Sequence, residues 1–369
     1  MFVERFMAWS VAVGAEQRAK AIVELAHSYL NNAIAEQDRA STEQVFSHYL
    51  KDPSTKVRAA MAVALCEREG APRRLLRLLS IDICEVASKV FERSQMFHPS
   101  ELAHALSNRS QTIQIAIARR GHMTADLARL VVEKGCAQAV EALLINEVVS
   151  LSPALKHDIA TRMGADCSIR NLLLEDDAIW PSTRQLLVRK VADHLASWAS
   201  DFAFETQFDM SEPASDATNL ATVEIAERTD PAEMNAYVSH LHETEQLTPA
   251  LLVRAICSGH AALFENAIAL LSGASLKRVQ AIVDEGRLSA FRALYRKTGL
   301  PLSARAVFEQ AIAAWQHSDQ PSAVVDMILG AIGDADEVDG DLMALLARID
   351  GEHHQTVRHS YDDQLLLAA

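Results

Sequence analysis

Apolar residues recur in pairs along the first half of the chain, between residues 52 and 174. The two members of each pair are spaced i, i+4, so they lie on one side of an α-helix. The pairs are Val57/Met61, Val86/Val90, Ile113/Ile117, Val140/Leu144 and Ile169/Leu173. Their first members are 29, 27, 27 and 29 residues apart. Another apolar helix is expected before each of the later four pairs. The pattern therefore predicts an all-α solenoid of stacked helical hairpins with a period of about 27–29 residues.

Prolines and glycines divide this part of the chain at similar intervals, and they predict hairpins over 71–94, 99–121, 124–146 and 152–175. The prolines fall near helix starts, where a missing N–H costs nothing. The glycines fall near helix ends, where we expect a left-handed backbone to close the helix. These residues are Pro72, Pro99 and Pro153 at the starts, and Gly121, Gly135 and Gly164 at the ends.

The chain before the first pair also has a helical pattern. Phe2, Phe6 and Trp9 share one face of a short segment, which we expect to cover the end of the first repeat. The alternative for this segment is an anchor at a membrane surface. Further helices are predicted over 16–35 and over 42–50, with Ser41 as the N-cap of the second.

The most specific local signal is the octet Lys-Asp-Pro-Ser-Thr-Lys-Val-Arg at residues 51–58. Asp-Pro turns the chain, and Val57 opens the next apolar face. An acid in the turn and an arginine six residues later resemble the HEAT repeat signature, which implies structural roles for Asp52 and Arg58 in joining neighbouring repeats. The second predicted repeat keeps Asp82 but has Ala87 in place of the arginine. The signature therefore does not predict Asp–Arg pairs along the whole stack.

A change in composition separates two blocks of helices. Residues 201–219 hold three phenylalanines and several acids, and we interpret them as a connector, with an acidic mobile loop as the alternative. Helices are predicted again from Leu220, with breaks at Gly259 and Gly286. The predicted organisation is an N-terminal repeat block at 1–200, an acidic connector at 201–219, a C-terminal repeat block at 220–350 and a tail at 351–369.

Several segments resemble a bacterial family of all-helical repeat proteins known as domain of unknown function 2336. They are residues 18–30, 52–65, 115–121, 247–273 and 288–301. The last two segments are the most specific of the five. The resemblance implies a helical repeat fold in two blocks and no activity, so it assigns no catalytic residues.

The net charge of the chain is −14, but it is unevenly distributed. Residues 51–135 carry 14 Lys and Arg against 9 Asp and Glu, whereas residues 201–250 carry 1 against 11. Because phosphate neutralisation dominates nucleic-acid affinity, we do not expect a nucleic-acid partner. The five cysteines are dispersed, and neither a signal peptide nor an apolar run of about 18 residues is present. We therefore expect a cytoplasmic protein without a membrane span.

Arginines of the early repeats are the candidate binding residues for an anion or an acidic partner. Stacked repeats place equivalent positions side by side, and the guanidinium fork suits carboxylates and phosphates. The candidates are Arg73, Arg74, Arg77, Arg93, Arg119 and Arg120, with Arg109 and Arg129 in the same stretch. The alternative is a solvated helix face with local ion pairs.

Motifs for catalysis and metal binding are absent from the sequence. His240 and His242 are two positions apart on a predicted helix, so they point to different faces. An EF-hand loop starting at Asp334 fails because Val338 and Asp339 occupy its fifth and sixth positions. There is no P-loop, no GxGxxG and no GxSxG. We expect neither an enzyme nor a metal or other cofactor.

The sequence favours a non-catalytic scaffold or regulatory adaptor that binds an unidentified protein partner on a solenoid surface with a mildly basic N-terminal face. The alternative is a sensor of a small anion or nucleotide, or a HEAT-like enzyme that processes nucleic acid. A third hypothesis is a homodimer formed through the apolar N-terminal segment or the phenylalanine-rich connector.

Overall fold

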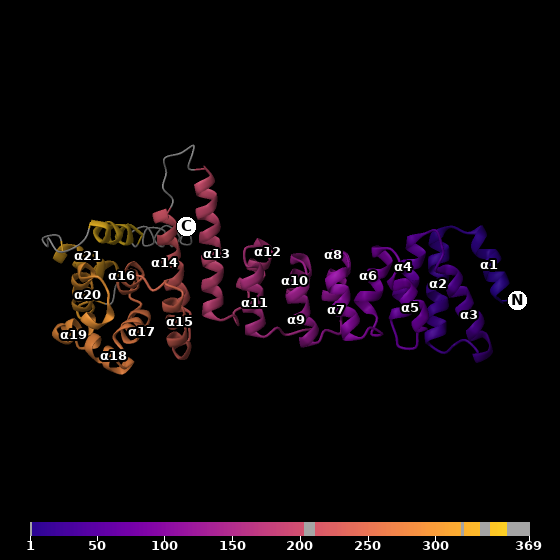
Figure 1. The fold of residues 1–369 in the computed structure, drawn as a ribbon, viewed down its shortest axis with the longest axis horizontal. Coiled ribbons are helices and arrows are strands. Elements are labelled where there is room, and N and C mark those ends of the chain that lie inside the picture. The colour runs from indigo at the N-terminus through magenta and orange to yellow at the C-terminus, as the bar shows by residue number, and fades with distance from the viewer. Residues whose placement is uncertain (1, 203–210, 319–320, 333–339, 353–369) are drawn as a thin grey trace, which may run out of the picture. The chain divides into compact units, whose positions relative to one another are not determined.

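The computed structural model describes residues 2–202, 211–318, 321–332 and 340–352. Throughout these ranges the regular structure is helical and there is no strand, which confirms the all-α prediction (Figure 1). The chain divides into two compact units, unit 1 ending at Ile179 and unit 2 beginning at Trp180. This boundary lies before the predicted connector at 201–219, so residues 180–200 of the predicted N-terminal block belong to unit 2.

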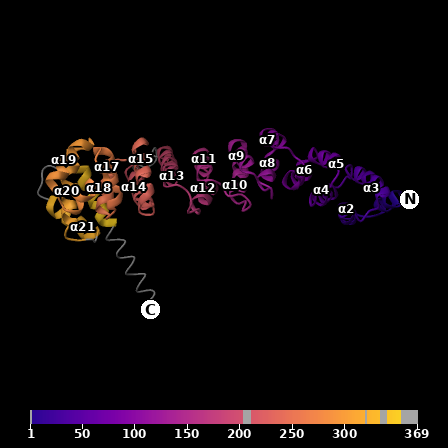
Figure 2. The same ribbon diagram turned by 90° about the horizontal axis from the view of Figure 1, so that it is seen from below.

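Unit 1 consists of short helices that follow one another with tight turns. They are α1 (Phe2–Ala12), α2 (Ala15–Leu30), α3 (Glu36–Tyr49), α4 (Thr55–Cys66), α5 (Arg73–Ser80), α6 (Cys84–Arg93), α7 (Pro99–Asn108), α8 (Gln111–Ala118), α9 (Ala125–Lys134), α10 (Ala137–Leu144), α11 (Pro153–Met163) and α12 (Cys167–Leu174). The even-numbered helices form one row in which each packs on the next, from α2 to α12 (Figures 1 and 2). In the odd-numbered row, α1 packs on α3, and α9 packs on both α7 and α11.

The core of the even-numbered row comes from the apolar pairs. Nine of the ten paired side chains are buried, and the exception is Leu144, which is half-buried. In α10 the buried positions equivalent to the other pairs are Ala139 and Leu143, the third and seventh residues of the helix. The buried face of α10 is therefore set one residue earlier than predicted, and Val140 is an additional buried residue.

Two helix boundaries near the N-terminus differ from the prediction. The helix predicted over 16–35 ends at Leu30, and the next begins at Glu36 rather than at residue 42. Ser41 therefore lies inside α3 and caps nothing. Acidic residues in the first turn favour the earlier start, because they stabilise the positive end of the helix dipole. Helix α1 packs on α3, with the Phe6 ring 5.8 Å from that of Tyr49.

The three glycines predicted to be left-handed have ordinary negative φ angles, so that prediction was wrong. Gly135 closes α9 with φ −71° and ψ 155°, because the chain continues directly in extended form into α10. A Cβ atom at this position would lie 2.5 Å from the carbonyl oxygen of Val131. Gly135 is thus required for a close approach of backbone rather than for a left-handed turn.

Unit 2 is built around α16. Its helices are α13 (Pro181–Phe202), α14 (Ser211–Glu227), α15 (Pro231–Glu243), α16 (Pro249–Cys257), α17 (Ala261–Ser272), α18 (Leu276–Asp284), α19 (Leu288–Thr298), α20 (Leu302–Trp315) and α21 (Pro321–Ile332), followed by a helix over 340–352. Helix α16 packs on α14, α17, α20 and α21, and its residues from Leu251 to Cys257 are all buried. The predicted breaks occur at Gly259 and Gly286, which have φ of 81° and 62°.

The predicted connector is partly helical. Its residues from 211 onward form the start of α14. Phe204 and Phe208 of the connector lie outside the described residues. The same is true of the acidic segment 333–339, which held part of the rejected EF-hand motif, and of residues 353–369 in the predicted tail.

Buried polar side chains join the helices of unit 2. Gln185 of α13 donates to Thr222 Oγ1 (2.9 Å) and to Gln246 Oε1 (2.6 Å), and it accepts from the Tyr237 hydroxyl at 2.9 Å. Arg254 of α16, only 1% exposed, pairs with Glu352 of the last described helix and lies 3.9 Å from Asp216. These contacts give partners to polar groups that would otherwise be costly to bury, although the Nε atom of Arg254 has no hydrogen-bond partner within the described structure.

Candidate functional site

Helix α5 carries three of the predicted binding arginines, and its sequence, RRLLRLLS, is strongly amphipathic. Leu75, Leu76 and Leu79 are buried, and α5 packs on α4 and α6 of the even-numbered row. Its outer face is formed by three arginines and one leucine, all exposed. These are Arg73, Arg74, Arg77 and Leu78.

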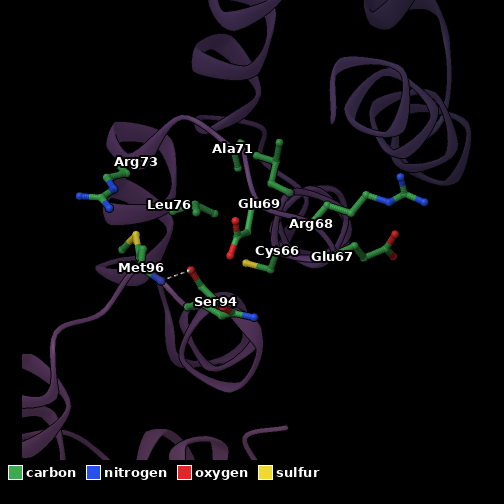
Figure 3. Close-up of a pocket in the computed structure, with 12 residues that line it drawn as sticks. Cys66, Glu67, Arg68, Glu69, Ala71, Arg73, Leu76, Ser94 and Met96 are labelled. Atoms are coloured by element: carbon green, nitrogen blue, oxygen red, sulfur yellow. Dashed lines mark hydrogen bonds between the residues drawn. The ribbon is translucent and has the colours of Figure 1, made fainter. Parts of the chain in front are cut away.

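Three clefts of unit 1 include residues of α5. The first, the Cys66 cleft, has a volume of about 560 Å³ and lies at the N-terminal end of α5 (Figure 3). The second, the Arg74 cleft, has a volume of about 690 Å³ and lies between α3 and α5. The third, the Phe91 cleft, has a volume of about 310 Å³ and lies between the end of α5 and α7. The short α5 therefore leaves an open space on each side.

The Cys66 cleft contains charges of both signs. Arg68 and Arg73 extend away from each other on opposite sides, while Glu69 lies near Cys66 (Figure 3). Glu67 also lines the cleft and pairs with His27 at 3.0 Å. Burial raises the pKa of the Cys66 thiol to about 12, so it is protonated at neutral pH and is a poor nucleophile.

Two carboxylates that line the Arg74 cleft, Asp52 and Asp82, form ion pairs with arginines of the preceding even-numbered helices. Arg18 donates to the carboxylate of Asp52 at 2.8 and 3.1 Å, and Arg58 donates to that of Asp82 at 2.7 and 3.1 Å. Arg58 also donates to the backbone carbonyl of Asp52 at 2.5 Å. Each arginine thus pairs with the acid in the turn before the next even-numbered helix, and Asp82 takes part although α6 has Ala87 in place of the arginine. A geometry with two parallel hydrogen bonds is the strongest that Arg and a carboxylate can form.

These pairs keep the two carboxylates charged. Burial alone would raise the pKa of Asp52 and of Asp82, but the hydrogen bonds from the arginines and from backbone N–H groups outweigh it and lower both pKa values. The negative charges of the Arg74 cleft are therefore permanent at neutral pH, and each is compensated by a guanidinium group.

Two further cations of the Arg74 cleft have no such compensation. Lys51 and Arg74 both line the cleft and are exposed, and no carboxylate pairs with either within the described part of the chain. Beside them, Leu78 and Ile81 line the same cleft with 41% and 65% of their surface exposed. The cleft surface is therefore positive and apolar at once.

The remaining predicted arginines do not converge on this cleft. Arg77 lies 3.5 Å from Glu101, and Arg129 lies 3.6 Å from Asp126. The guanidinium carbon of Arg109 lies 5.8 Å from the centre of the Phe91 ring. Arg93 and Arg119 are exposed at the ends of α6 and α8. One continuous basic groove is thus absent from the described part of unit 1.

Arg120 is not a surface residue, which corrects its assignment to the binding set. Its side chain is 4% exposed and donates to the backbone carbonyls of Phe91 and Ser94 at the end of α6. Asn146 has the equivalent place after α10 and donates to the carbonyls of Ala118 and Arg120. Because the last carbonyls of a helix lack partners within the helix, these side chains complete the ends of the preceding even-numbered helices, α6 and α8. Arg120 and Asn146 share a position two residues after a helix, but no local sequence pattern marks either as the donor to these distant carbonyls.

Metal ligands do not gather in the described residues, where no group of three or more His, Cys, Asp or Glu side chains could hold an ion. His240 and His242 lie in the last turn of α15. None of the helices within the described ranges is long and apolar enough to cross a membrane.

Together these features define an all-α protein whose helices pack largely in sequence order, with open clefts around one short amphipathic helix. The chain belongs to the family described as "Uncharacterised protein conserved in bacteria (DUF2336)", whose model matches residues 86–340. The segments 115–121, 247–273 and 288–301 lie inside this match, whereas 18–30 and 52–65 precede it. No curated protein and no solved structure matches the chain. The residues that line the Arg74 cleft all precede the family match.

Proposed function

We propose that the protein is a non-catalytic interaction scaffold whose N-terminal unit is a HEAT-like α-solenoid and whose α5 surface binds an acidic segment of a protein partner. The sequential packing of the even-numbered helices and the Arg–Asp pairs between repeats support the solenoid. Such stacks contact only their neighbours and leave long surfaces for partners.

The observation that carries the proposal is the combination of side chains in the Arg74 cleft. Its carboxylates are already paired with arginines, whereas Lys51 and Arg74 are available. Exposed Leu78 and Ile81 add apolar surface beside these cations. Interfaces between proteins combine an apolar centre with charged groups that direct the approach of the partner.

The Cys66 cleft gives less support to a small-anion or nucleotide sensor. Its two arginines extend in opposite directions, and its two glutamates would repel a phosphate group. The thiol in this cleft is neutral, so it offers no activated nucleophile. These features favour binding of a protein segment at α5 over binding of a nucleotide.

The proposal is tested by crosslinked affinity capture from the native bacterium with the full chain as bait. Arg73→Glu/Arg74→Glu reverses two exposed charges on α5, and Arg93→Glu/Arg119→Glu reverses two exposed charges elsewhere on unit 1 as a matched control. We expect the wild type and the control to recover the same partner and the α5 variant to recover at least tenfold less. Absence of any specific partner from the wild-type sample would overturn the scaffold proposal.

A further inference from the structure

We infer that the Arg74 cleft is a specific docking site for a short peptide segment in which acidic side chains flank a large apolar side chain. This inference rests on the proposed function and assigns the site and the chemistry of the partner. The cleft volume of about 690 Å³ falls within the range of roughly 300–1,000 Å³ that is usual for ligand sites.

The charges of the cleft determine the acidic part of the partner. Asp52 and Asp82 are neutralised by Arg18 and Arg58, so the electric field at the cleft is that of Lys51 and Arg74. The chain as a whole has a charge of −14, so an acidic segment is repelled by most of the molecule and attracted here. The planar fork of Arg74 can hold one carboxylate with two hydrogen bonds, and Lys51 can pair with another.

The apolar side chains determine the remainder of the partner. Leu78 and Ile81 are more exposed than most large apolar residues of unit 1, and they line the same cleft as Lys51 and Arg74. Exposed ion pairs alone contribute little affinity, so most of the binding must come from burying this apolar surface. A partner with only acidic residues would leave Leu78 and Ile81 in water.

A nucleic-acid strand fits this cleft less well than a peptide does. Two available cations can neutralise only about two phosphates, which supports weak and strongly salt-dependent binding. The aromatic side chains on which bases stack are absent from the residues that line the Arg74 cleft. The chemistry of the cleft therefore favours an acidic and apolar peptide.

The test is a selection from a random 12-residue peptide library on the full-length protein, followed by fluorescence anisotropy with the selected peptides. We expect the selected sequences to combine Asp or Glu with Leu, Ile or Phe. Arg74→Glu and Ile81→Asp should each weaken their binding at least tenfold. Arg119→Glu is the matched control for charge and Ile145→Asp, 60% exposed, is the matched control for the apolar change. Both controls should bind within twofold of the wild type.

Circular dichroism melts accompany each variant, because Arg74 and Ile81 are exposed and their replacement should leave the fold intact. The inference is overturned if no peptide is selected, if the selected peptides lack acids, if Arg74→Glu binds them normally, or if a 12-nucleotide single strand binds more tightly than the peptides. A captured partner that binds Arg74→Glu normally would overturn this inference and leave the scaffold proposal standing.

Discussion

Replacement of Arg120 by methionine is expected to destabilise unit 1, although replacement of the adjacent Arg119 is not. The two arginines follow each other in sequence, but Arg120 is buried and donates to two backbone carbonyls at the end of α6, whereas Arg119 is exposed. Methionine keeps much of the length and the apolar stem of arginine, so the substitution removes mainly the guanidinium group.

The magnitude follows from the hydrogen bonds of Arg120. A hydrogen bond to a charged group contributes about 1.5–3 kcal/mol, so loss of two costs about 3–6 kcal/mol. In the wild type, the cost of burying the guanidinium group offsets part of the stabilisation from these two hydrogen bonds. Its Nε atom also lacks a hydrogen-bond partner within the described structure. Removing the charge recovers that cost, which leaves a net loss of about 2–4 kcal/mol. For a unit of this size, each kcal/mol lowers the melting temperature by about 2–4 °C.

The assay is urea unfolding together with differential scanning calorimetry of the full chain. Arg120→Met should lower the melting temperature of the unit 1 transition by roughly 5–15 °C. Arg119→Met should change the free energy of unfolding by less than about 0.5 kcal/mol. Arg120→Lys keeps the charge but lacks the planar fork, so its loss of stability should lie between those of Arg119→Met and Arg120→Met. Equal effects of the two methionine substitutions would refute the assignment of Arg120 to the helix end.

Three further predictions concern stability. The pKa values of Asp52 and Asp82 are lower in the folded state than in the unfolded chain. Their contribution to the free energy of unfolding is therefore present above the unfolded pKa of about 3.9 and is lost as pH falls through the folded values. Asp82→Asn should flatten the acid limb of a pH–stability curve measured by urea unfolding. Tyr237→Phe should cost unit 2 about 1–3 kcal/mol, measured in the same way, because Gln185 Oε1 loses a buried donor; an unchanged midpoint would contradict this. Gly135→Ala should lower stability by about 1–3 kcal/mol, because its Cβ would meet the Val131 carbonyl oxygen. Gly121→Ala, where nothing lies within 4 Å, should be neutral in the same calorimetric comparison.

The period of the apolar pairs predicted the fold class because burial on one helix face is a local property of the sequence. Side chains of Val57, Val86 and Ile113 are all buried, as a 3.6-residue repeat requires. The one-residue shift at Val140 could not be predicted in this way, because Val140 and Leu144 satisfy the same spacing as Ala139 and Leu143. Tertiary packing of α10 between α8 and α12 decides between the two registers.

The candidate site was predictable only in part. The arginines of α5 are visible in the sequence, but their division between two clefts depends on how neighbouring helices are spaced. Arg119 and Arg120 have the same chemistry, and only the position of the α6 carbonyls makes one of them a structural residue. Because these carbonyls lie 26 and more residues away in sequence, no local pattern identifies the donor that will reach them.

The row of even-numbered helices has a consequence for how this chain can vary. From α4 to α10, each helix of the row packs on the one before it and the one after it, so a change in one helix alters directly only the contacts of its neighbours. Residues before Val86 lie outside the family match, and they form the hairpins that precede α6. The proposed docking site lies in these leading helices, outside the part of the chain that the family model matches. On the proposed function, a protein with the same matched helices but a different leading segment would bind a different partner.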